Sequence, residues 1–67
     1  MNREQAVRIH KRLMDAYIAL EHASTATADL GKEERLELDG AIQEVIAALQ
    51  QDLLTPIHDQ YPDLEPH

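Results

Sequence analysis

The first thirty residues carry an apolar or small side chain at alternating intervals of three and four positions. The series is Ala6, Ile9, Leu13, Ala16, Leu20, Ala23, Thr27 and Leu30. An unbroken 3-4 alternation over more than three heptads is typical of one long amphipathic helix. Asn2 precedes the series and suits a helix N-cap. We therefore expect a first helix over about residues 3–29.

A second apolar series follows Gly31, which stands where a left-handed residue commonly ends a helix. Its members are Leu38, Ile42, Val45, Ile46, Leu49 and Leu53. Glu33 and Glu34 precede them and would lie in a first turn, where acids favour the helix dipole. We expect a second helix over about residues 33–54.

The short connection predicts that the two helices form an antiparallel hairpin. A turn near residue 31 would bring Leu13 close to Leu49 and Leu20 close to Ile42. Gly40 lies inside the second helix, where glycine costs about 1 kcal/mol relative to alanine. It is either a tolerated defect or the mark of a close helix crossing.

Prolines define the C-terminal segment. Pro56 is expected to end the second helix, because proline lacks an N–H and disfavours helical geometry in the residue before it. Thr55 could instead cap one new helical turn over residues 56–61, with Pro56 in its first position. In either case residues 1–55 are the hairpin and residues 56–67 a short Pro-rich turn and tail. The apolar tail residues should fold back as a latch over the open end of the hairpin, covering Ile9 and Leu53. These latch residues are Ile57, Tyr61 and Leu64.

An unpacked tail would instead be a candidate docking peptide. Residues Tyr61 to Leu64, which read YPDL, are similar to the YPxL short linear motif of viral late domains, which recruit a sorting adaptor. The similarity covers four residues, and no function is transferred from it.

The first helix carries more apolar surface than one seam requires. Val7, Met14 and Ile18 form a second stripe about 150° from the first, as 100° per residue dictates. A chain of 67 residues without cysteine cannot form disulfides, and burying this stripe in another subunit would supplement its small core. The predicted interface comprises Val7, His10, Met14, Tyr17, Ile18, Leu36 and Leu54.

The expected fold is therefore all-α, a two-helix hairpin that dimerises into an antiparallel four-helix bundle. A higher oligomer or an obligate complex with another protein would bury the same stripe.

Charge and hydropathy limit the possible partners. The net charge is −7, and residues 13–67 alone carry −10. This acidic balance argues against general nucleic-acid binding, which needs a basic surface. The chain has no apolar run of the roughly 18 residues that span a membrane, and we expect a cytoplasmic protein without a membrane partner.

Chemistry-bearing residues form no recognised constellation. His10 and His58 could approach one another at the open end of the hairpin, but their spacing matches no known metal motif. No catalytic residue, metal ligand or cofactor is predicted. We interpret the chain as a homodimeric adaptor, accessory or regulatory protein without catalysis. The alternative is an acidic inhibitor that binds the basic, nucleic-acid-binding surface of a partner.

Overall fold

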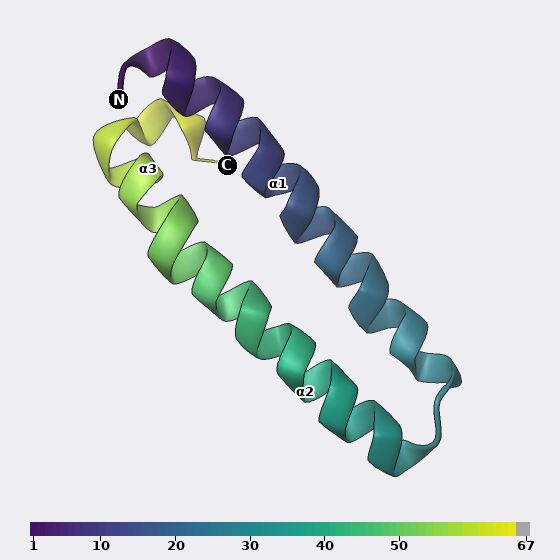
Figure 1. The fold of residues 1–67 in the computed structure, drawn as a ribbon. Coiled ribbons are helices and arrows are strands. Elements are labelled where there is room, and N and C mark those ends of the chain that lie inside the picture. Colours follow the sequence, from purple (N-terminus) through teal and green to yellow (C-terminus); the bar gives the residue numbers. More distant parts are fainter. Residues whose placement is uncertain (66–67) are drawn as a thin grey trace.

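The computed structural model describes residues 1–65, which form two antiparallel helical arms joined by a short turn (Figure 1). The elements are, in chain order, α1 (Arg3–Ala26), a 3₁₀ turn (Thr27–Asp29), α2 (Lys32–Ala48), a π-helical segment (Leu49–Leu54), α3 (Thr55–Gln60) and a 3₁₀ turn (Pro62–Leu64). The described residues contain no strand. The predicted all-helical hairpin is thus confirmed.

The start of α1 follows the predicted N-cap. The side-chain oxygen of Asn2 accepts a hydrogen bond of 2.8 Å from the backbone N–H of Gln5. The Gln5 side chain in turn accepts one of 2.9 Å from the backbone N–H of Asn2. This reciprocal capping box satisfies two N–H groups that the first turn of a helix leaves unpaired.

The turn between the arms differs from the prediction. Gly31 has φ −61° and ψ 158°, which is extended rather than left-handed. No residue from 1 to 65 has a positive φ. The last turn of the first arm tightens instead into a 3₁₀ turn, where the Thr27 hydroxyl donates 2.6 Å to the carbonyl of Ser24. Gly31 then begins α2, its carbonyl accepting 2.9 Å from the N–H of Arg35.

The second arm continues through Pro56 as α3, so it does not stop at residue 54, and the alternative of a new helical turn that starts at Pro56 agrees better with the structure. A π-helical segment immediately precedes the proline, and Thr55 closes it with a backbone N–H that bonds to the carbonyl of Gln50. The Thr55 hydroxyl donates to the same carbonyl at 2.8 Å. Pro56 thereby falls in the first turn of α3, where its missing N–H costs little.

The π-helical segment also changes which side chains face α1. Each residue of a π-helix turns through a smaller angle than in an α-helix, because its hydrogen bonds span one more residue. The segment therefore rotates the end of the second arm. Leu54, which lies well off the stripe in a regular α-helix, becomes buried, as does Ile57.

The contact line of α1, called the seam here, is rotated from the predicted one. Buried or half-buried positions on α1 are Ala6, His10, Leu13, Met14, Tyr17, Leu20 and Ser24. The predicted seam residues Ile9, Ala16 and Ala23 are exposed instead. The rotation brings polar side chains of α1 to polar partners on the second arm, which satisfies groups that would otherwise be half-buried without hydrogen bonds.

The cross-arm hydrogen bonds fix the register. The Ser24 hydroxyl donates to the carboxylate of Asp39, and Gln43 Nε2 donates 3.0 Å to that hydroxyl. Nearer the open end, Gln50 Nε2 donates 3.3 Å to the hydroxyl of Tyr17. A Cβ atom added to Gly40 would meet no atom within 4 Å, so no close helix crossing occurs there within the hairpin.

Candidate interaction surface

Two broad faces flank the seam of the hairpin. A helix turns about 100° per residue, so the residue just before a seam position lies on one side and the residue just after it on the other. In an antiparallel pair, these two sides coincide for both helices. The residues just before seam positions therefore form one face of the hairpin, and the residues just after them form the opposite face.

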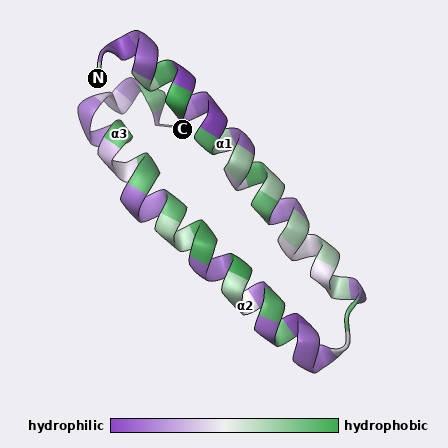
Figure 2. Ribbon diagram, viewed as in Figure 1, coloured by the Kyte–Doolittle hydropathy of each residue, from purple (hydrophilic) through white to green (hydrophobic). Residues whose placement is uncertain are grey.

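Most of the preceding residues are apolar, so we call their side the apolar face; Gln5 and Arg12 are its polar members near the N-terminus. Its large exposed members are Ile9, Leu38, Val45 and Leu53, with exposed fractions of 45%, 50%, 53% and 47%. Its small exposed members are Ala16, Ala23, Ala41 and Ala48. Figure 2 shows apolar residues recurring along both arms between hydrophilic ones. This face extends along the hairpin, and its branched side chains alternate with alanines, which have only a methyl group.

The following residues make what we call the mixed face. Val7 and Ile18 are exposed there, at 42% and 48%. They are accompanied by exposed polar residues of both arms, namely Lys11, Glu21, Thr25, Gln43 and Gln50. Gln43 and Gln50 make the cross-arm hydrogen bonds described above. Two glutamines of the mixed face are thus hydrogen-bonded to seam residues of α1.

The predicted interface residues are divided between surface and seam. Val7, Ile18 and Leu36 are exposed. His10, Met14 and Tyr17 are half-buried along the seam, and Leu54 is buried at 6% exposure. The structure therefore does not gather the seven residues on one surface.

The sequence did not reveal the apolar face as an exposed surface, because its large members were placed in the seam. The sequence did contain an indication of the observed seam. His10, Tyr17 and Ser24 recur every seven residues, as expected of polar residues that lie in the contact line and have polar partners there.

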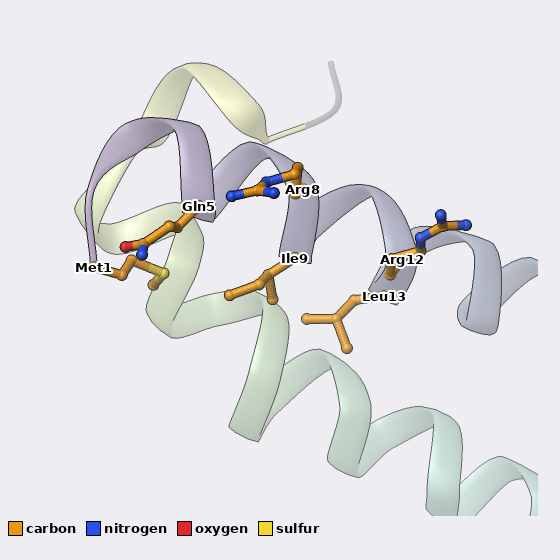
Figure 3. Close-up of a pocket in the computed structure, with 6 residues that line it drawn as sticks. All are labelled: Met1, Gln5, Arg8, Ile9, Arg12 and Leu13. Carbon is orange, nitrogen blue, oxygen red and sulfur yellow. The ribbon is translucent and has the colours of Figure 1, made fainter.

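A shallow hollow of about 660 Å³ adjoins the apolar face near the N-terminus. It is lined by Met1, Gln5, Arg8, Ile9, Arg12 and Leu13. In Figure 3, Ile9 and Leu13 point from α1 towards the neighbouring arm, whereas Arg12 extends away from it. The hollow joins an apolar floor to a basic rim.

The tail folds back at the open end of the hairpin, where the latch was placed. Ile57 is buried at 4% exposure, and Tyr61 and Leu64 are half-buried. The Tyr61 hydroxyl donates 3.0 Å to the carbonyl of Met1. The tail does not cover Ile9 or Leu53, which stay exposed. Those two residues are therefore available on the apolar face.

An ion pair also joins the tail to the basic start of α1. The guanidinium of Arg3 donates two hydrogen bonds to the carboxylate of Asp63, one of them 3.0 Å long. Those bonds hold the pKa of Asp63 below its usual value. Arg12 lies 4.0 Å from Asp15 on its own helix. The basic start of the chain is thus balanced in part by the tail and in part within α1.

Two histidines meet at the open end. Nε2 of His10 lies 3.0 Å from Nε2 of His58, and their ring centroids are 5.1 Å apart with planes inclined by 59°. Both rings are half-buried. Burial lowers the pKa of His10, and the neighbouring His58 lowers it further. The pair forms because the rotation of α1 turns His10 towards His58 on α3.

Within residues 1–65, no helix is both long and apolar enough to cross a membrane. Comparison with protein-family models, with curated proteins and with solved structures finds no match.

Proposed function

We propose that this chain is a protein-protein interaction module that pairs with a second copy of itself through the apolar face, giving a four-helix bundle. The observation that carries the proposal is the alignment of four large, half-exposed aliphatic residues along that face. Soluble monomers rarely expose large apolar patches, and several large aliphatic side chains exposed on one face commonly mark a site of association.

The surface area of the hairpin supports association. The accessible surface is 5030 Å², whereas a compact monomer of this mass would expose about 4,300 Å². The excess of about 700 Å² is close to the roughly 800 Å² that each partner buries in an interface of standard size.

The shape of the hairpin leads to the same proposal. Its radius of gyration is 14.3 Å, compared with about 11 Å for a compact domain of equal length. No large side chain is fully buried within the described residues. A second copy laid on the apolar face would enclose Ile9, Val45 and Leu53 and supply the second layer that a helical core requires.

The alanines of the apolar face favour close packing. Ala16 and Ala23 lie on α1, and Ala41 and Ala48 lie on α2. Knobs on one hairpin, such as Leu38 and Val45, need holes on the other, and small residues between large ones provide them. The mixed face and the basic rim of the hollow would stay outside the bundle, free for the partner of an adaptor or accessory subunit.

Sedimentation equilibrium at micromolar concentration tests the proposal. The wild-type chain should sediment as a dimer, and Val45→Glu should shift it to monomer because a charge cannot be buried unpaired in that interface. Ile18→Glu is the matched control, since Ile18 is a β-branched residue of similar exposure on the mixed face. A well-folded wild-type monomer would contradict the proposal. Dissociation by Ile18→Glu but not Val45→Glu would assign the interface to the mixed face.

The acidic inhibitor is the competing proposal, and salt separates the two. A basic partner held by charge should be released as the ionic strength rises. An apolar interface between two copies should persist under the same conditions. Sedimentation at low and high salt therefore distinguishes charge-driven from apolar association.

A further inference from the structure

We propose that His10 and His58 together bind a divalent transition-metal ion, which fastens α3 to α1 at the open end of the hairpin. The two ring nitrogens already converge, with Nε2 of one ring 3.0 Å from Nε2 of the other. Imidazole nitrogen is a common ligand of zinc, copper and nickel. This proposal is independent of self-association.

The separation of the two nitrogens fits a shared metal. Zinc binds histidine nitrogen at about 2.0–2.1 Å. Two such bonds at angles between 90° and the tetrahedral value place the nitrogens roughly 2.9–3.4 Å apart. The observed 3.0 Å falls inside that span. The distance between the two nitrogens therefore needs little change for both of them to bind one ion.

The protonation of the pair is compatible with binding. A metal requires the neutral imidazole, with the lone pair of Nε2 free and the proton on Nδ1. In the metal-free pair at most one proton lies between the two Nε2 atoms, so one lone pair already points at the other ring. When each ring carries its single proton on Nδ1, both Nε2 lone pairs are free, and the metal ion binds where the shared proton was.

The surroundings determine the rest of the coordination shell. His58 borders a hollow of about 440 Å³, which Tyr17, Gln50 and Glu65 also line. Within residues 1–65, no third His, Cys, Asp or Glu groups with the pair closely enough to make a three-ligand site. Water would therefore occupy the remaining positions. Two nitrogen ligands and water favour Cu²⁺, Ni²⁺ and Zn²⁺ over Mg²⁺ and Ca²⁺, which prefer oxygen.

Binding to the pair should stabilise the folded chain. The two histidines are 48 positions apart in sequence, so an unfolded chain offers them only one at a time. A ligand that binds the folded state alone stabilises it by a free energy that grows with the logarithm of the ligand concentration relative to Kd, and so raises the melting temperature. For a domain of this size, a hundredfold excess of Zn²⁺ over Kd should raise Tm by roughly 10 °C or more.

The test is thermal unfolding of the full chain with and without Zn²⁺, repeated with Ni²⁺. A double variant, His22→Ala with His67→Ala, retains only His10 and His58, and it should be stabilised as much as the wild type. His10→Ala and His58→Ala should each lose the shift, every variant being compared with its own metal-free Tm. Mg²⁺ should stabilise none of them.

Imidazole NMR gives a second readout that does not depend on stability. Adding Zn²⁺ to the wild type should shift the ring signals of His10 and His58 together and leave those of the exposed His22 in place. The proposal is overturned if Zn²⁺ stabilises no form, if His10→Ala keeps the full shift, or if the double variant loses it.

Discussion

The two ends of the hairpin are held by different kinds of contact. Towards the turn, the arms are joined by a polar group of Ser24, Asp39 and Gln43. At the open end they are joined by buried aliphatic side chains, chiefly Leu54 and Ile57. The polar end has little apolar burial, whereas the open end combines burial with the histidine pair and the tail contacts.

Chain connectivity explains the difference. The turn keeps its neighbouring residues close at small entropic cost, because the connecting loop is short. The open end brings together residues that are 60 apart in sequence, such as Met1 with Tyr61 and Arg3 with Asp63. Ends of that kind fray unless buried contacts hold them. The comparison indicates that hydrophobic burial at the open end largely determines whether the hairpin closes over its full length.

The largest effect should come from the buried residue of α3. Ile57→Ala should lower the free energy of unfolding by about 2–4 kcal/mol, through lost burial and a residual cavity. Ile18→Ala is the matched control, because Ile18 is 48% exposed and Ile57 only 4%. The control should stay within about 0.5 kcal/mol of wild type. Urea unfolding at one fixed protein concentration measures both.

A loss below about 1 kcal/mol for Ile57→Ala would contradict the importance of the open end. Equal losses in both variants would show that Ile18 is as buried in solution as Ile57. Self-association through the mixed face would give that result.

A smaller effect is expected at the turn. Ser24→Ala removes a hydroxyl that donates to Asp39 and accepts from Gln43. The unfolding free energy should fall by about 1 kcal/mol, the usual contribution of such hydrogen bonds. Thr25→Ala is the control, since its hydroxyl donates only to the Glu21 carbonyl within α1. If Ser24→Ala costs as much as Ile57→Ala, the two ends do not differ as described.

The sequence predicted the hairpin but not the rotation of its helices. The 3-4 series and Asn2 predicted α1 because both act locally. Ala6, Leu13 and Leu20 belong equally to the predicted seam and to the observed one, so apolar spacing alone leaves two rotations open. Polar pairs across the arms, such as Tyr17 with Gln50, select between them. Such pairs become visible only when the register of the two arms is known.

Local preference predicted either a helix end or a new helical turn at Pro56, and it could not choose between the two. Proline disfavours a helix, and that preference was correctly assessed for a regular α-helix. The π-helical segment Leu49–Leu54 supplies a different geometry just before the proline. Its formation turns Leu54 and Ile57 into the seam, and the burial gained there offsets the poorer helix geometry. Tertiary burial thus decided the helix end, and the site at His58 follows from it.

The smallest effect concerns the exposed ion pair at the open end, and it depends on pH. Hydrogen bonds from Arg3 hold the pKa of Asp63 below its usual value. A carboxyl with a lower pKa in the folded state stabilises the fold above its unfolded pKa, and this contribution is lost as pH falls through the folded pKa. The difference in unfolding free energy between wild type and Asp63→Asn should therefore be constant above about pH 5 and disappear as the pH falls below the folded-state pKa.

Salt gives the same pair a second test. The side chains of Arg3 and Asp63 are 57% and 54% exposed, so added salt should reduce the difference between wild type and Asp63→Asn at neutral pH. Gln50→Ala removes an uncharged cross-arm hydrogen bond and is the matched control, because its effect should not follow salt or acid. A difference for Asp63→Asn that is equally insensitive to both would mean that the ion pair does not help to hold the tail. The open end would then depend on the burial of Ile57 and Leu54 and on its uncharged contacts, which would sharpen the contrast with the polar turn.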